Sequence, residues 1–150
     1  MSLTQYKSKR NLTKTKEPSA KKIKKTERKK LIYMVHEHHA THLHWDLRLE
    51  MNGVLKSWAV PKTPTAKEGI KRLAIQVEDH PISYATFKGI IPEGNYGAGE
   101  VKIWDTGSYE LIEKTPTKII INIHGKKLKG KYALIKTNYT NKKSWLFFKI

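Results

Sequence analysis

The stretch Leu43-His-Trp-Asp-Leu-Arg-Leu-Glu-Met-Asn-Gly-Val-Leu-Lys-Ser-Trp-Ala-Val60 decides the fold of this 150-residue chain. From Leu43 to Met51 apolar residues alternate strictly with polar ones, which is the period of a half-buried β-strand. Asn52-Gly53 follows, the strongest short signal for a two-residue turn between antiparallel strands. Residues 54–60 then read as the returning strand, which a proline stops. The stretch therefore predicts a β-hairpin with one apolar and one polar face.

The two-residue turn also sets the register of this hairpin. On the apolar face, counting back from the turn gives the pairs Met51–Val54, Leu49–Lys56, Leu47–Trp58 and Trp45–Val60. Side chains paired in this way share one face of the sheet. On the polar face Arg48 lies opposite Ser57, and Asp46 lies opposite Ala59. Small residues opposite a polar row leave room for a metal ion and a substrate.

The rest of the chain reads as further short strands separated by turn signals. A short apolar run covers 31–35, and strands are expected at 72–78, 101–104, 108–112, 118–123, 131–137 and 144–150. Turn signals lie at Thr106-Gly107, 114–116, Gly125, Gly130 and 138–141. Many short strands at such spacing predict a mainly β domain, either a barrel or a sandwich. We expect this single domain over 31–150, after a basic, disordered tail over 1–30.

Charge and composition narrow the class of partner. The chain has 30 Lys and Arg against 13 Asp and Glu, a net charge of +17. Residues 1–30 hold +10 of it, from twelve basic and two acidic residues. This balance favours a polyanion, nucleic acid before an acidic membrane surface. The lack of cysteine excludes disulfides and thiolate zinc sites and fits the cytoplasm of a prokaryote. No apolar run suits a membrane span or a signal peptide.

Histidines are concentrated at the start of the hairpin. Five of them fall between His36 and His44, and Asp46 and Arg48 follow. Imidazole and carboxylate are ligands that divalent metals share, and guanidinium matches the geometry of a phosphate. His44, Asp46 and Arg48 occupy successive positions on one strand face, about 6.6 Å apart. The pattern predicts a metal site beside a phosphate-binding arginine, and two histidines with a carboxylate suit Mn, Fe or Zn.

The other histidines of this cluster have different expected roles. His38 would lie on the same strand face as His44, but about 20 Å from it along a straight strand. We therefore infer that residues 39–43 bend or loop back so that His38 reaches the metal. For His36 and His39 we prefer a surface or hydrogen-bonded role. His42, and with it His36, is a candidate to support the ligands without binding the metal.

Two more motifs lie downstream. In Val77-Glu-Asp-His80-Pro-Ile-Ser-Tyr84, His80 ends an alternating segment on its polar face, and alone it would be read as structural. The segment Gly89-Ile-Ile-Pro-Glu-Gly94-Asn-Tyr-Gly97-Ala-Gly99 lacks the Lys-Ser/Thr ending of a nucleotide-binding loop. Its glycines allow backbone to approach backbone or ligand closely. A tight structural loop and direct substrate contact are equally compatible with it.

Together these motifs resemble a known family. The segments His38-x5-His44-x-Asp46-x-Arg48-Leu-Glu, Val77-Glu-Asp-His-Pro81 and Ile91-Pro-Glu-Gly-Asn-Tyr-Gly-Ala-Gly99, with the returning strand up to Pro61, carry the resemblance. They are similar to the 3′-phosphoesterase domain of the bacterial end-joining DNA ligases called ligase D. The similarity covers about residues 5–150 and no ligase or polymerase module is present, so we expect the stand-alone form. The resemblance implies a β-barrel with the active site at one polar end.

The resemblance also implies an activity. Members of the family remove a 3′-terminal phosphate from DNA in a Mn²⁺-dependent reaction, and many also remove a terminal ribonucleotide. Co²⁺ or Zn²⁺ are other candidates for the site. By position, the implied metal ligands are His38, His44 and Asp46, and the implied catalytic residues are Arg48, His80 and Tyr84. The implied partners are DNA or RNA–DNA 3′ ends of primer–template form and a separate ligase or polymerase of an end-joining system.

The tail matches the family more weakly, through Arg10, Asn11 and Glu17, which are candidates for substrate binding. The family usually has Asp where Asn11 stands, and commonly Gln where His36 stands. Both departures bear on the diester-cleaving step of ribonucleotide removal more than on phosphate release. The competing interpretation is a non-catalytic nucleic-acid-binding β-barrel with a structural metal, which the basic tail and interspersed aromatic residues would also suit.

Overall fold

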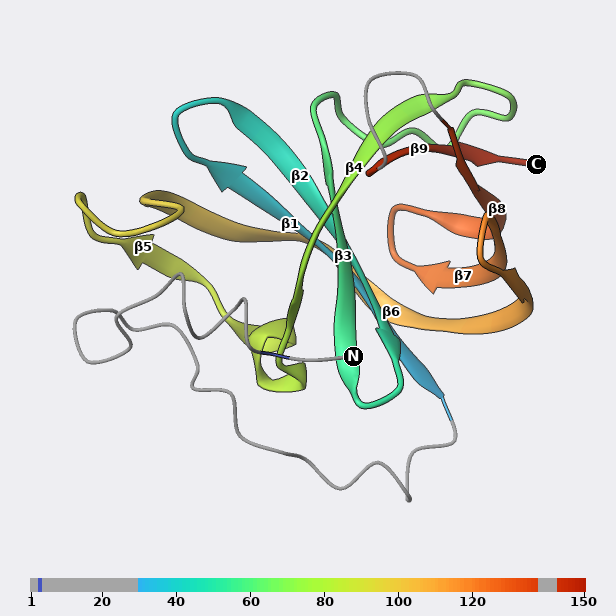
Figure 1. Ribbon diagram of the computed structural model, residues 1–150, viewed down its shortest axis with the longest axis horizontal. Coiled ribbons are helices and arrows are strands. Elements are labelled where there is room, and N and C mark those ends of the chain that lie inside the picture. Colours follow the sequence, from blue (N-terminus) through green and yellow to red (C-terminus); the bar gives the residue numbers. More distant parts are fainter. Residues whose placement is uncertain (1–2, 4–29, 138–142) are drawn as a thin grey trace.

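The computed structural model describes Leu3 and residues 30–137 and 143–150, and this part of the chain is mainly β-strand (Figure 1). The strands are β1 (Leu31–His39), β2 (Leu43–Met51), β3 (Val54–Val60), β4 (Arg72–His80), β5 (Gly89–Ile91), β6 (Gly99–Thr115), β7 (Lys118–Gly125), β8 (Lys129–Lys136) and β9 (Ser144–Lys149). A short 3-10 helix, η1 (Ile82–Thr86), connects β4 to β5. Within the described ranges no helix is long and apolar enough to cross a bilayer.

The strands form one antiparallel sheet that closes on itself. Its order is β1-β2-β3-β4-β9-β8-β7-β6-β5, and β1 also pairs with β6. This extra pairing joins β1 to β6, so eight strands make a barrel. The remaining strand, β5, pairs with the start of β6, beyond the part of β6 that pairs with β7. The mainly β fold and the barrel are confirmed, and the sandwich is excluded.

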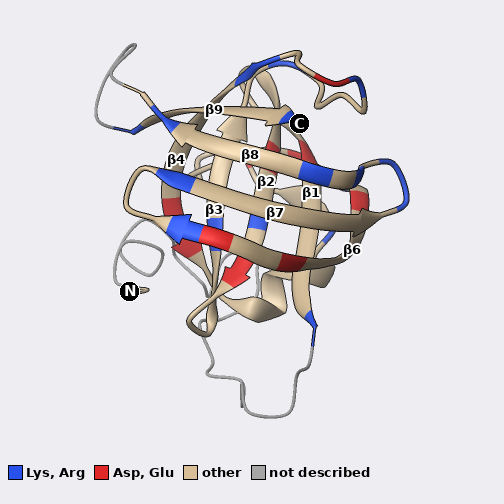
Figure 2. Cartoon of the chain, turned by 90° about the vertical axis from the view of Figure 1, so that its right-hand side faces the viewer, with Lys and Arg blue, Asp and Glu red and all other residues tan. Residues whose placement is uncertain are grey.

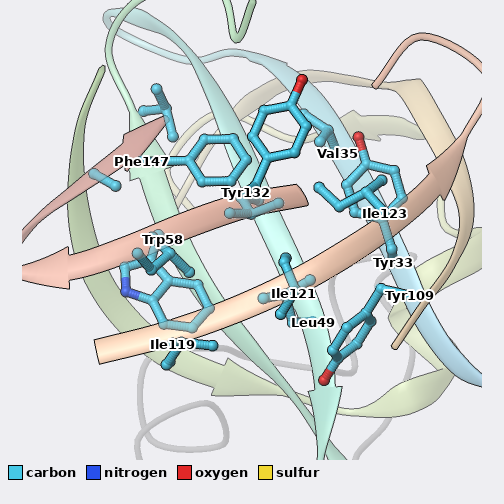
Figure 3. Close-up of a cluster of buried hydrophobic side chains, with 14 of the residues drawn as sticks. Tyr33, Val35, Leu49, Trp58, Tyr109, Ile119, Ile121, Ile123, Tyr132 and Phe147 are labelled. Atoms are coloured by element: carbon cyan, nitrogen blue, oxygen red, sulfur yellow. The ribbon is translucent and has the colours of Figure 1, made fainter. Parts of the chain in front are cut away.

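The interior of the barrel is filled by alternate residues of its strands, several of them aromatic (Figure 3). The central side chains are at most 1% exposed and include Leu49, Trp58, Tyr109, Ile121 and Phe147. They come from five different strands, so the core ties the whole ring together. Burial of this apolar surface is the main term that favours the folded barrel. Each strand thereby turns its other face outward.

A buried carboxylate fastens β6 to the turn between β7 and β8. Asp105 is 3% exposed, and its Oδ2 accepts a hydrogen bond from the Tyr33 hydroxyl at 2.8 Å. The backbone N–H groups of residues 126–128 also donate to this carboxylate, at 2.9–3.0 Å. Burial, with the charge of Asp105, raises the pKa of Tyr33, so its hydroxyl stays a donor. Buried donors held in this way keep the turn in one conformation.

The predicted hairpin over 43–60 is confirmed in its strand limits and in its register. The pairs run from Met51–Val54 to Trp45–Val60, and Arg48 lies opposite Ser57. Asn52 and Gly53 both have positive φ, 53° and 82°. A two-residue turn that matches the twist of the strands requires positive φ at both positions, and Asn and Gly tolerate it best.

The sequence pattern is wrong at Thr106-Gly107, which is not a turn. The dipeptide lies inside β6, a single strand that covers the two expected at 101–104 and 108–112. Glycine is required there for another reason. A Cβ on Gly107 would lie 2.1 Å from the carbonyl oxygen of His124 on β7. The residue therefore allows a close approach between neighbouring strands, as glycine in a strand interior often does.

A second layer covers part of the outer face of the barrel. Strand β1 extends beyond the expected 31–35, and η1 and β5 have no counterpart in the predicted strands. A second apolar cluster packs these parts together and contains Met34, Leu55, Tyr84, Ala85, Phe87, Ile91 and Val101. Met34 alternates with the core residues Tyr33 and Val35, so this cluster lies outside the barrel wall. Figure 2 views the opposite part of the wall, where β6 to β9 lie side by side.

Candidate active site

A pocket of about 270 Å³ opens on the polar outer face of the wall, toward the end where β1 turns into β2. Its ionisable lining residues are His38, His44, Asp46, Arg48, Glu78, His80, Tyr84 and Tyr96. Its other lining residues are Ala40, Ala59, Val77, Ile91 and Gly97. The structure thus brings all six residues predicted as metal ligands or catalytic groups into one pocket. Ala59 lies opposite Asp46, so the small residue leaves space as expected.

The turn between β1 and β2 brings His38 to the other ligands. His38 pairs directly with His44 across the two strands, and their ring centroids are 4.8 Å apart. The expected reversal over 39–43 is therefore confirmed as a hairpin turn. One ligand atom from each of His38, His44 and Asp46 can be chosen so that all lie within 4.8 Å of one another. Small side-chain movements would bring them to the roughly 2.0–2.3 Å that metal–ligand bonds require.

Backbone carbonyls determine which ring nitrogen each histidine presents. The Nε2 of His38 donates to the carbonyl oxygen of Gly97 at 2.7 Å, and the Nδ1 of His44 donates to that of His42 at 3.0 Å. The other nitrogens, Nδ1 of His38 and Nε2 of His44, lie 3.5 and 3.3 Å from the carboxylate of Asp46. A metal-binding histidine commonly donates its second N–H in this way, which fixes its tautomer and orientation.

The carboxyl group of Asp46 is ionised despite its burial. Only 5% of the residue is exposed. Burial alone would raise the pKa of this carboxyl, but the charge of Arg48 and the contacts with His38 and His44 hold the pKa well below its ordinary value. Burial likewise acts to lower the pKa of His44, and its contact with Asp46 raises the pKa overall. A buried negative charge next to two imidazoles is a favourable place for a cation.

Arg48 is held rigidly on the same face, next to the three candidate ligands. It is 2% exposed, and its Nε donates to Nδ1 of His36 at 3.0 Å. One Nη donates to the hydroxyl of Ser57 at 2.8 Å, and the other lies 3.4 Å from the carboxylate of Asp46. The guanidinium also lies over the ring of Tyr84, 4.9 Å from its centroid. These contacts fix the plane of the guanidinium and direct it along the pocket wall.

His36 orients Arg48 from below and does not line the pocket. Its Nε2 donates to the carbonyl oxygen of Phe87 at 2.8 Å, so its Nδ1 is the acceptor for Arg48. Burial, followed by the charge of Arg48, lowers the pKa of His36 to about 3. A neutral ring is needed here, because a protonated Nδ1 would oppose the guanidinium. His36 is thus hydrogen-bonded, as preferred from the sequence, but it is buried and not on the surface.

His80 and Tyr84 form the wall of the pocket beyond Arg48. His80 is 3% exposed, and its Nδ1 lies 3.0 Å from the carbonyl oxygen of Glu78 and 3.2 Å from an Nη of Arg48. The rings of His80 and Tyr84 pack edge to face with centroids 4.7 Å apart. Tyr84 comes from η1, which places its ring against both His80 and Arg48. The wall is therefore built by β4 and η1 together.

The glycine-rich segment positions His38 through its backbone. Gly97 supplies the carbonyl that accepts from His38, and a Cβ on Gly97 would lie 3.4 Å from that imidazole ring. A Cβ on Gly99 would lie 2.0 Å from the carbonyl oxygen of His39. Both glycines have positive φ, 76° and 136°. A tight structural loop therefore describes Gly99, while Gly97 also lines the pocket.

The remaining candidates are placed as follows. His39 is exposed, and its Nε2 lies 2.6 Å from the carboxylate of Glu37. His42 is exposed and supports His44 through its carbonyl. The tail candidates Arg10, Asn11 and Glu17 lie outside the described residues. Sequence reasoning placed Ser57 opposite Arg48 but missed its hydrogen bond to the guanidinium. It also missed the carbonyls of Phe87 and Gly97, because only the fold brings them to His36 and His38.

Comparison with known proteins finds sequence similarity over most of the chain. Residues 36–136 match the family model described as the DNA ligase D 3′-phosphoesterase domain. The chain is 46% identical over 152 residues to the multifunctional non-homologous end joining protein LigD of Pseudomonas aeruginosa, covering 97% of this chain and 18% of that protein. It is also 46% identical over 155 residues to the LigD protein of Mycolicibacterium smegmatis, covering 96% and 20%. The chain thus spans about a fifth of the length of these curated relatives.

Proposed function

Because the chain belongs to the family of the DNA ligase D 3′-phosphoesterase domain, we propose that it is a metal-dependent phosphoesterase that removes the phosphate from 3′ ends of DNA. The relatives are named as end-joining proteins, so we place this activity in the repair of broken ends before a ligase or polymerase uses them. One observation carries the proposal. Three residues that could hold a cation line the same pocket as a buried arginine.

The donor set fits a divalent metal ion. Two imidazole nitrogens with fixed tautomers and one ionised carboxylate would hold it: His38, His44 and Asp46. This set suits Mn²⁺, with Co²⁺ or Zn²⁺ as alternatives. Three protein ligands leave coordination positions open to water or substrate, whereas structural sites are usually closed by four. The open pocket therefore favours an enzyme over a non-catalytic nucleic-acid-binding barrel with a structural metal.

The residues around the ligands have matching roles. A bound divalent ion would supply positive charge next to the phosphate and make water more acidic. Arg48 would offset the charge on the phosphoryl oxygens through paired N–H donors. His80 would donate a hydrogen bond to the phosphate or a proton to the leaving sugar oxygen. No serine, threonine or cysteine of the described chain lines the pocket, so we prefer direct attack by water.

The test is phosphate release from a primer–template with a 3′-phosphate, with and without a chelator. We expect release to stop in the chelator and to return when Mn²⁺ is added, with Mg²⁺, Co²⁺ and Zn²⁺ compared in parallel. The same primer bearing only a 5′-phosphate is the control and should release nothing. Far-ultraviolet circular dichroism should be unchanged by the chelator. If fold and DNA binding are lost together, the metal is structural; if release continues in the chelator, the metal assignment fails.

A further inference from the structure

We propose that Tyr96 forms a stacking surface for the nucleobase of the terminal nucleotide, so that the site selects nucleotide 3′ ends over other phosphomonoesters. This inference rests on the proposed function and adds the part of the substrate that is recognised beyond the phosphate. It starts from the lining of the pocket. Besides the three candidate ligands and Arg48, the pocket is lined by Tyr96, Ile91 and Ala40.

The pocket is larger than its ionic part needs. Its 270 Å³ is the space of about nine water molecules at roughly 30 Å³ each. A metal ion and one phosphate group would leave part of this space unfilled. The phosphate of a DNA end is joined to a sugar and a base, and these groups have to lie beside the ionic part. An apolar and aromatic lining is the usual surface for such groups.

Tyr96 is exposed, and its distance from the metal ligands is set by the fold. The residue is 46% exposed and directly precedes Gly97, whose carbonyl accepts from His38. The loop closes with backbone hydrogen bonds from Asn95 to Pro92 and from Ala98 to Asn95, at 3.3 and 3.1 Å. The phenol ring is therefore attached to the same short loop that orients a ligand. Stacking on such a ring needs only a flat face and not a particular base, so any terminal nucleobase could use it.

The experiment compares two DNA probes that differ only in the terminal nucleobase. One primer–template ends in thymidine 3′-phosphate, and the other ends in an abasic 3′-phosphate. We expect the unaltered chain to prefer the first in kcat/KM by about tenfold or more, mainly through KM. Tyr96→Ala should bring this ratio close to one. Tyr96→Phe and Tyr96→Trp should keep it, because their rings still stack.

Two further measurements separate stacking from a structural role of the loop. Ile112→Ala, which alters a half-exposed residue of β6 outside the pocket, should leave the ratio unchanged. Mn²⁺ affinity, measured by calorimetry, should be the same in Tyr96→Ala as in the unaltered chain. The inference is overturned if the ratio survives in Tyr96→Ala, if the unaltered chain has no preference, or if both probes and Mn²⁺ affinity decline together. Release from neither probe by the unaltered chain would instead overturn the proposed function itself.

Discussion

Alanine at Gly99 and at Gly94 forms a matched pair that tests how the glycine-rich loop holds His38. Both glycines have positive φ, so a side chain is strained at either position by about 1–3 kcal/mol. They differ in their surroundings. A Cβ at Gly94 meets nothing within 4 Å, whereas one at Gly99 would lie 2.0 Å from the carbonyl oxygen of His39. Displacing that backbone costs about 1–3 kcal/mol more. Gly99→Ala should therefore have a free energy of unfolding about 1–3 kcal/mol lower than that of Gly94→Ala.

The displaced backbone directly follows His38, so the same change should disturb the metal site. We expect Mn²⁺ affinity to fall about tenfold or more in Gly99→Ala and to stay unchanged in Gly94→Ala, because misplaced ligand support costs about 10–100-fold in affinity. Urea unfolding measures the stability difference, and isothermal calorimetry measures the affinity. Equal stability and equal affinity in the two variants would refute the idea that this loop locks the end of β1.

Further predictions concern the barrel, the arginine and the tail. Asp105→Ala should lower the free energy of unfolding by about 3–5 kcal/mol in urea, because Tyr33 and three backbone donors lose their acceptor; a loss under 1 kcal/mol would contradict this. Arg48→Lys should lower kcat by about 10²–10³-fold while Mn²⁺ affinity is kept; unchanged turnover would exclude a catalytic role for the guanidinium. Deleting residues 1–30 should flatten the slope of log K against log salt, by about 0.9 for each DNA phosphate that the tail neutralises, and an unchanged slope would exclude the tail from DNA binding. Asn11→Asp should bring the rate of ribonucleotide removal closer to the rate of phosphate release, both measured on matched primers. An unchanged ratio of the two rates would exclude a role for Asn11 in the diester step.

The parts of the fold that follow from the sequence are those with local signals. The hairpin over 43–60 is specified by alternation within each strand and by a turn dipeptide with its own conformational preference. Gly107 shows where local signals fail. It reads as a turn residue, but its place is determined by the His124 carbonyl on another strand. Strand β1 is obscured for a related reason. Its residues 36–39 are all polar, with His38 in the pocket and His36 bonded to Arg48, so they break the apolar pattern.

The candidate site likewise contains residues that could be placed from the sequence and contacts that could not. Asp46 and Arg48 could be placed together because they share one strand face. His38 could be placed only by assuming a reversal of the chain, which the hairpin turn confirms. The support for Arg48 could not be predicted, because it comes from the His36 ring, whose other nitrogen bonds the carbonyl of Phe87, 51 positions along the chain. Such contacts depend on the packing of η1 and β5 over the barrel wall.

The most direct test of the central claim is a Mn²⁺ titration followed in two ways, by heat of binding and by release of 3′-phosphate from a primer–template. The account predicts that both curves rise together and saturate at one ion per chain. In Asp46→Asn, which keeps the size of the side chain but removes its charge, both should be lost while circular dichroism and urea unfolding show a folded barrel. Phosphate release by Asp46→Asn at the rate of the unaltered chain, at the same Mn²⁺ concentration, would contradict the account.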